Sequence, residues 1–318
     1  MRAMRLFRLA LVLCASVALA KKQDYAGEGA DRMAAEIDAN GDVEQPQSAD
    51  MAVHEAAATQ GLNAQYKDAL TDIMAVLLHG SEASKEAAVE RMVGLAVATG
   101  EAGREQARMF RSAVVAGGAL PALITTLSAE QGRRQWLAAA AIHALALDDP
   151  ETDMDNFHQR EICQAGAVPA LVRLLEAEEP QLQSTVTQAL ATLAENPTCQ
   201  AMIAAEGAIA PLLQMAHYGS DMQKLGALGA LDVLSVNNPK VHAQLQKEGA
   251  PQVLTGLASM GSGMLRDEAQ TFGARLAEGA PPSKMNAETQ VKTARATRMR
   301  YDGVRQRAFQ RMQGWQEG

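Results

Sequence analysis

The sequence predicts an all-α solenoid, and three observations support this fold class. A short phrase built around Gly-Ala recurs four times in the 318-residue chain. A Leu stands five residues after the anchor glycine of each phrase, and another stands 27 residues after it. The anchors are 48, 41 and 42 residues apart, and this period is typical of stacked helical units. The anchors are Gly118, Gly166, Gly207 and Gly249, and the leucines are Leu123, Leu145, Leu171, Leu193, Leu212, Leu234, Leu254 and Leu276.

Each unit contains the signals of three helices. The anchor glycine ends a short first helix in the left-handed conformation that glycine adopts at little cost. A proline such as Pro121 or Pro169 then begins the second helix, where its missing N–H is not needed. Ser184–Asn196 is an example of the third helix, because its Val and Leu residues recur at helical spacing on one face.

The register extends to a weaker repeat before these four. Counting back places its anchor at Asp68 and its last helix at Ser84–Ala98. The first two anchor glycines are 48 residues apart because of an insertion at Asp148–His158. This polar stretch is expected to form an exposed loop. We therefore predict about five repeats, within a solenoid domain of residues 59–280.

The Gly-Ala-x-Pro turn followed by leucines resembles the armadillo repeat, in which one short and two longer helices form each unit of a right-handed superhelix. The HEAT repeat is the alternative, but its usual signature is not centred on this turn. The resemblance implies a concave groove lined by the third helices. Nuclear-import adaptors carry a Trp-x-x-x-Asn pair on each of these helices. The equivalent positions here contain neither Trp nor Asn, so that way of gripping an extended peptide does not transfer.

We expect the groove to bind protein through its shape and a few side chains. Trp136 is the expected anchor, since an exposed Trp is a common interaction hot spot. The alternative is that Trp136 packs against the preceding repeat. The expected groove residues are Trp136, Gln188, Thr192, Val233 and Arg275.

No motif in the sequence indicates catalysis or a cofactor. The six histidines are scattered, and there is no metalloprotease, P-loop, hydrolase-elbow or dinucleotide-binding pattern. Glu36–Glu44 resembles the opening of a calcium-binding loop, but Val43 and Ala49 replace its required Gly and Glu. We therefore predict a non-enzymatic protein without a cofactor or a metal site.

Residues 1–20 have the pattern of a secretory signal peptide. A basic start and about a dozen apolar residues precede Ala18-x-Ala20, with cleavage expected before Lys21. The alternative is an uncleaved anchor or a wrongly assigned start. We expect the secretory pathway, either the endoplasmic reticulum lumen or secretion, with a plastid as the alternative if the source is an alga with complex plastids. No later segment has the length of a membrane span.

Charge divides the mature chain into an acidic body and a basic tail. Residues 21–58 are polar and acidic, which predicts a flexible leader. After cleavage the net charge is −11, with +5 on residues 281–318 and about −16 on the body. Such a body argues against nucleic-acid binding. We expect the tail helix, Asn286–Trp315, to cap the last repeat; the alternatives are docking onto the acidic body and contact with anionic lipid.

Two further expectations concern the cysteines and the partner. Cys163 and Cys199 lie at different offsets from their anchors, so we expect buried free thiols, with a disulfide as the alternative. Asn237–Leu254 looks like a helix start in nucleotide-exchange factors of the lumenal heat-shock ATPase chaperone. That resemblance implies a chaperone partner as an alternative to a general scaffold. We expect the protein to be a monomer.

Overall fold

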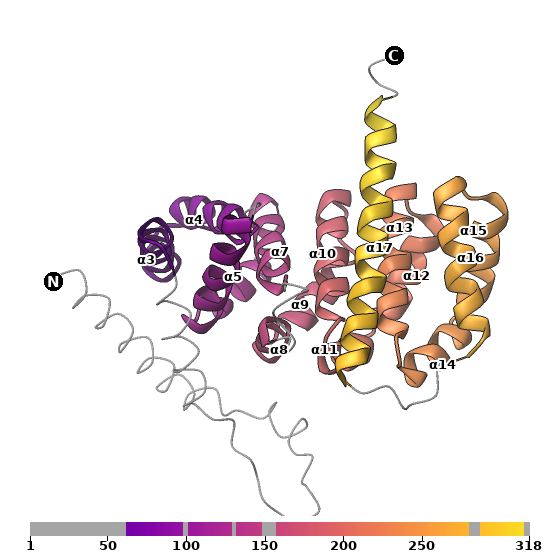
Figure 1. Cartoon of the computed structure of the whole chain (residues 1–318). Coiled ribbons are helices and arrows are strands. Elements are labelled where there is room, and N and C mark those ends of the chain that lie inside the picture. The colour runs from indigo at the N-terminus through magenta and orange to yellow at the C-terminus, as the bar shows by residue number, and fades with distance from the viewer. Residues whose placement is uncertain (1–61, 98–100, 129–131, 148–156, 280–286, 315–318) are drawn as a thin grey trace, which may run out of the picture.

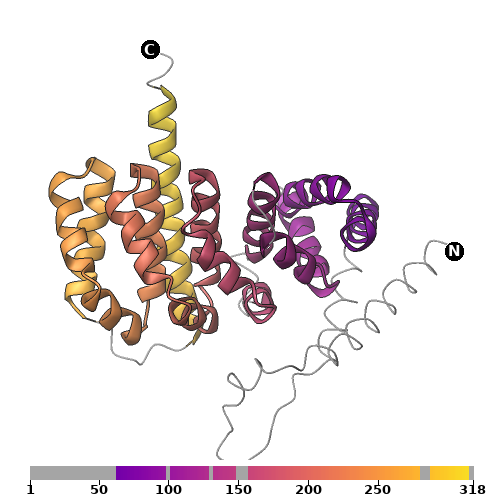
Figure 2. The ribbon, with the colours of Figure 1, turned by 180° about the vertical axis from the view of Figure 1, so that it is seen from behind.

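A computed structural model describes residues 62–97, 101–128, 132–147, 157–279 and 287–314 of the chain. These residues contain fifteen helices and no strand, and the helices are stacked into a solenoid (Figures 1 and 2). The predicted signal peptide, residues 1–20, and the predicted leader, residues 21–58, lie outside the described residues.

The helices group into one repeat of two helices and four repeats of three, followed by one separate helix. Repeat 1 contains α3 (Ala64–His79) and α4 (Glu82–Ala96). Repeat 2 contains α5 (Glu101–Ala116), α6 (Leu120–Ser128) and α7 (Arg133–Ala146). Repeat 3 contains α8 (Phe157–Gln164), α9 (Ala167–Leu174) and α10 (Pro180–Leu193). Repeat 4 contains α11 (Pro197–Ala205), α12 (Ile209–Tyr218) and α13 (Asp221–Ser235). Repeat 5 contains α14 (Pro239–Lys247), α15 (Ala250–Met260) and α16 (Gly263–Ala277), and α17 (Ala287–Gly314) follows.

The anchor glycines make the turn between the first and second helices, as predicted. All four have φ between +80° and +88°, a conformation that is cheap only for glycine. After α11, the Ala208 N–H donates to the Ile203 carbonyl at 3.3 Å, and the Gly207 N–H donates to the Ala204 carbonyl at 3.1 Å. These two bonds satisfy carbonyls that the end of a helix would otherwise leave unpaired.

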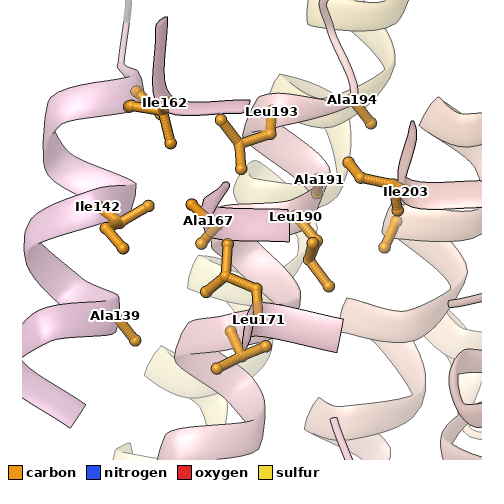
Figure 3. Close-up of a cluster of buried hydrophobic side chains, with 14 of the residues drawn as sticks. Ala139, Ile142, Ile162, Ala167, Leu171, Leu190, Ala191, Leu193, Ala194 and Ile203 are labelled. Carbon is orange, nitrogen blue, oxygen red and sulfur yellow. The ribbon is translucent and has the colours of Figure 1, made fainter. Parts of the chain in front are cut away.

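The core of the solenoid is apolar and continuous between repeats. The recurrence of these leucines at a fixed register predicts that they are buried between helices. All eight are buried, with at most 3% of any of these residues exposed, which confirms that prediction. Figure 3 shows Ile142 of α7, Leu171 of α9, and Leu190 and Leu193 of α10 within one buried cluster. Alanines such as Ala139 and Ala167 let these helices approach closely.

The insertion ends earlier than the sequence suggested. We expected an exposed loop from Asp148 to His158, but α8 already begins at Phe157. His158 is buried, and its Nε2 lies 2.9 Å from the Ser112 hydroxyl of α5. Because the insertion is polar, the sequence did not indicate that its last residues begin α8, the helix that packs His158 against the preceding repeat. Residues 148–156 lie outside the described residues.

Cys163 of α8 and Cys199 of α11 are joined by a disulfide, with 5.8 Å between their Cα atoms. Our expectation of free thiols was wrong. The different offsets of the two cysteines do not keep them apart, because the first helices of repeats 3 and 4 contact each other directly. The bond therefore ties two neighbouring repeats together.

Helix α17 does not cap the last repeat, which corrects our first expectation for the tail. It lies instead along α10 and α13 and also contacts α11, so the alternative of docking onto the acidic body describes its position. Both views show it between these helices, and its C-terminal turns extend beyond the solenoid (Figures 1 and 2).

No single described helix has the length and apolar character of a membrane span. Part of α5 (Gly103–Ala116) and α6 reach that length only as a pair bent by 78°.

Candidate functional site: a basic helix on the third-helix face

The third helices of successive repeats pack side by side in the order α4, α7, α10, α13 and α16. We call the side of this row on which α17 lies the third-helix face. Helix α17 covers the part formed by α10, α13 and α16, and we call this part the covered half. The part formed by α4 and α7 is the open half. The covered half is the candidate site because it holds an ordered segment through specific contacts.

The first contact is a carboxylate that receives two arginines. Glu195, just after α10, has only 1% of its side chain exposed. The Arg295 Nε lies 2.9 Å from it, and the Arg298 Nε donates to its other oxygen. The Arg298 Nη1 also donates to Asp302 of α17 at 2.6 Å. Both cations on Glu195 therefore come from α17.

The second contact is an arginine that bridges two carboxylates. The Arg300 Nη2 lies 3.0 Å from Asp232 of α13, and its Nη1 lies 2.6 Å from Glu268 of α16. Asp232, which is 2% exposed, also accepts from Arg275 of α16. A planar guanidinium suits this geometry, since it presents several donors in fixed directions.

Burial changes the proton affinity of these groups. Burial raises the pKa of Asp232 to about 6, although Arg275 and Arg300 act to lower it. Burial alone would lower the pKa of Arg298, but the carboxylates of Glu195 and Asp302 outweigh it and raise the pKa above the usual value. The covered half therefore holds its charges in a poorly hydrated environment, where each depends on its partner.

Between these two ionic contacts, a glycine leaves a notch that the ring of Tyr301 occupies. Gly229 of α13 faces the ring of Tyr301, and a Cβ at Gly229 would lie 2.9 Å from the Tyr301 Cγ. Tyr301 is 2% exposed, and burial is the main cause that raises its pKa well above the ordinary value. A small hollow remains beside it, lined by Thr187, Gln188, Ala191, Gly226, Gly229, Ala230, Arg298, Tyr301 and Asp302.

A polar network fixes the N-terminal part of α17. The Gln290 side chain donates to Gln200 Oε1 at 3.3 Å and accepts from the Asn237 amide at 3.1 Å. The Gln200 amide donates in turn to the carbonyls of Val233 and Val236 at 2.9 and 3.1 Å. Because these groups are buried or half-buried, each hydrogen bond compensates for lost hydration.

The structure places the five predicted groove residues in different environments. Trp136 is half-buried, and its indole N–H donates to the Thr185 hydroxyl of the following repeat at 3.0 Å. Gln188 lines the hollow beside α17, and Arg275 pairs with Asp232.

Thr192 and Val233 are fully buried and offer no surface in this structure. They are buried because they lie one residue past Ala191 and Asp232, the positions that face α17, and so turn into the packing between repeats. That any of the five binds a partner stays a prediction.

Sequence reasoning missed the three carboxylates that hold α17. Glu195, Asp232 and Glu268 lie in or just after third helices, and a search limited to the two expected offsets passed over them. The charge contrast between the acidic body and the +5 tail was the available signal. Within the described part of the chain, no group of three or more His, Cys, Asp or Glu residues is arranged to hold a metal ion.

Comparison with known proteins gives a consistent result for the fold. Residues 158–195, which span α8 to α10, match the family model of the Armadillo/beta-catenin-like repeat. No match to this chain was found among curated proteins.

Three solved structures are similar in fold. A computationally designed armadillo repeat protein for modular peptide recognition is 21% identical, with a TM-score of 0.58 over 72% of this chain and 92% of that chain. A designed armadillo repeat protein in complex with peptide (KR)4 is 21% identical, with a TM-score of 0.57 over 72% and 91%. The armadillo repeats only protein from Plasmodium falciparum is 13% identical, with a TM-score of 0.55 over 73% and 100%. Residues 158–195 therefore match one armadillo-type repeat, and the chain shares the fold of armadillo solenoids.

Proposed function

We propose that this protein is a non-enzymatic scaffold of the secretory pathway that binds other proteins through its third-helix face. The observation that carries the proposal is α17, a 28-residue helix of the same chain that this face already holds. A surface that orients a helix through buried carboxylates and a glycine notch has the anatomy of a protein-binding site.

Two of the similar structures support a peptide or protein as the ligand. One is a designed protein for modular peptide recognition, and another is in complex with the peptide (KR)4. Both share the fold of this chain at low identity, so they support the class of ligand and leave the partner's identity open.

Photo-crosslinking can test which face binds. A photoreactive amino acid would replace an exposed third-helix residue, Glu90 of α4 or Thr271 of α16. Matched controls would carry it at exposed second-helix residues, Arg173 of α9 or Gln214 of α12. We expect protein adducts from the third-helix positions only. Equal adducts from both sets would contradict binding through this face.

The secretory part of the proposal rests on the sequence of residues 1–20. The Cys163–Cys199 disulfide supports it, since such bonds persist mainly in oxidising compartments. Mass spectrometry of protein isolated under alkylating, non-reducing conditions should find the two cysteines linked and the mature chain beginning at Lys21. A chain that begins at Met1 with two free thiols would contradict this part. Cell fractionation would separate the endoplasmic reticulum and secreted pools from a plastid pool.

The nucleotide-exchange alternative gains no support from the segment that suggested it. Asn238 caps α14 by accepting from the Val241 N–H at 3.2 Å, and its amide donates to Gln200 at 3.2 Å. Both contacts are structural roles of Asn238 within the solenoid. An ADP-release assay with a lumenal heat-shock ATPase should therefore show no acceleration by this protein.

A further inference from the structure

We infer that the covered half of the third-helix face selects helices with the pattern Arg-x-x-Arg-x-Arg-aromatic, and that α17 occupies this site in place of such a helix of a partner protein. The inference rests on the proposed function, because it names the class of segment that the proposed binding face takes. Helix α17 supplies the pattern as Arg295, Arg298, Arg300 and Tyr301.

The geometry explains this spacing. At 3.6 residues per turn, Arg298 lies about 60° from Tyr301 around the helix, and Arg300 lies about 100° away on the opposite side. Tyr301 therefore points into the notch at Gly229 while the arginines reach out on both flanks. The flank of Arg298 and Arg295 meets Glu195, and the flank of Arg300 meets the α13 and α16 carboxylates. A helix with its arginines on one flank only would leave a buried carboxylate unpaired.

The contacts also favour arginine over lysine. Arg300 contacts Asp232 and Glu268 through two different nitrogens of one guanidinium. A lysine ammonium is a single centre and lacks the planar fork that spans two carboxylates. We therefore expect a peptide with lysines at the three arginine positions to bind at least ten-fold more weakly.

Helix α17 docks through buried apolar side chains, among them Val291, Ala294 and Val304, as well as through ion pairs. Exchange with a partner helix is physically reasonable because the ion pairs, which select the helix, add little net stability. Buried ion pairs lose hydration energy that offsets much of their attraction, so their net contribution is small. Covalent attachment gives α17 a high effective concentration, which favours it over a free helix. When α17 leaves the site, Glu195 loses both of its arginine partners. This buried carboxylate is therefore paired only while a basic helix, either α17 or the partner helix, is bound.

The test uses the full chain and a labelled synthetic peptide of residues 287–306. A variant with Arg295→Glu and Arg298→Glu places like charges against Glu195 and should release α17. We expect this variant to bind the peptide at least ten-fold more tightly than the wild-type chain does. An exposed control on the same helix, Arg307→Glu, should behave like wild type. Adding Glu195→Lys to the double variant should abolish binding.

Four outcomes would overturn the inference. The folded double variant could fail to bind the peptide, or it could bind a scrambled peptide of the same composition equally well. Sedimentation could show that the double variant forms a dimer that excludes the peptide, which would make a second copy the occupant. Hydrogen exchange on the wild-type chain gives the fourth outcome without any substitution. In that experiment, saturating peptide should lower the protection of the α17 amides. Unchanged protection would contradict the replacement of α17 by the peptide. If these tests fail but cross-linking from Glu90 and Thr271 is retained, the inference is wrong and the proposed function still stands.

Discussion

The two halves of the third-helix face share one architecture but treat charge in different ways. In the open half, Arg133 of α7 pairs with Glu86 and Glu90 of α4 at 2.8 and 3.2 Å, and 61% of its side chain is exposed. In the covered half, Glu195 is 1% exposed and pairs with Arg295, which is 7% exposed. In the open half, a solvent-exposed arginine of the solenoid itself neutralises these two carboxylates. In the covered half, buried carboxylates are neutralised largely by arginines of α17.

This difference shows that the repeat determines the core and leaves the face free to vary. The recurrent leucines are buried equally in both halves. What distinguishes the covered half is a few residues on its surface, namely three acidic side chains and the glycine at the notch. The comparison predicts that core substitutions have similar effects in the two halves and that face substitutions do not.

The largest contrast is expected at the acidic residues of the face. Glu195→Gln leaves Arg295 and Arg298 buried without a carboxylate, which should cost about 3–5 kcal/mol or release α17. Glu90→Gln removes one partner of an exposed pair and should cost about 0–1 kcal/mol. Urea unfolding gives the free energies, and hydrogen exchange of α17 reports its release. Equal effects at the two sites would remove the distinction between the halves.

The core should show no such contrast. Leu145 of α7 and Leu193 of α10 occupy the same position in the repeat, and both are fully buried. Leu145→Ala and Leu193→Ala should each lower the free energy of unfolding by about 2–5 kcal/mol, because each leaves a cavity between helices. Calorimetry or urea unfolding measures both. A small effect in only one half would indicate that the repeats there are packed differently.

Much of the fold could be predicted because the repeat imposes the same physical requirement several times. A glycine with positive φ and buried leucines at fixed offsets are local signals, and Gly166, Leu171 and Leu193 show them within one unit. The disulfide was not predicted, because it depends on how the first helices of neighbouring repeats meet.

The candidate site was harder to predict because it joins segments far apart in the sequence. Arg295 and Glu195 are 100 residues apart, and no periodicity in the chain connects them. Charge alone made docking of the tail onto the body one of three alternatives. The close approach of Gly229 and Tyr301 was not predictable either, because it depends on how α13 and α17 pack.

A moderate effect on stability is expected at two glycines, one in each half of the face, and it sharpens the comparison. A Cβ at Gly229 would lie 2.9 Å from the Tyr301 Cγ, whereas a Cβ at Gly94 of α4 would meet nothing within 4 Å. Gly229→Ala should therefore destabilise the docked α17 by about 1–3 kcal/mol. Gly94→Ala should stabilise the chain by up to about 1 kcal/mol, since alanine favours a helix more than glycine does. Thermal unfolding of both variants should give opposite signs, and the same sign in both would contradict a tight notch.

The smallest expected effect is a pH dependence that belongs to the covered half. Burial raises the pKa of Asp232 to about 6, above its ordinary value of 3.8, while Arg275 and Arg300 oppose the shift. The folded chain therefore binds a proton at Asp232 more readily than the unfolded chain does. The resulting stabilisation is full below pH 4 and is lost as the pH rises through about 6.

Asp232→Asn isolates this contribution from that of other groups. Tyr301 and Glu268 also face the site, and burial together with Arg275 lowers the pKa of His242, whose contribution to stability falls as the pH falls. Because the variant keeps these groups, the wild-type free energy of unfolding minus that of the variant should increase by about 1 kcal/mol between pH 7 and pH 5. Urea unfolding at constant ionic strength measures this difference. A difference that shrinks as the pH falls would mean that the two arginines outweigh burial, and that Asp232 holds α17 as an ionised partner across this whole range.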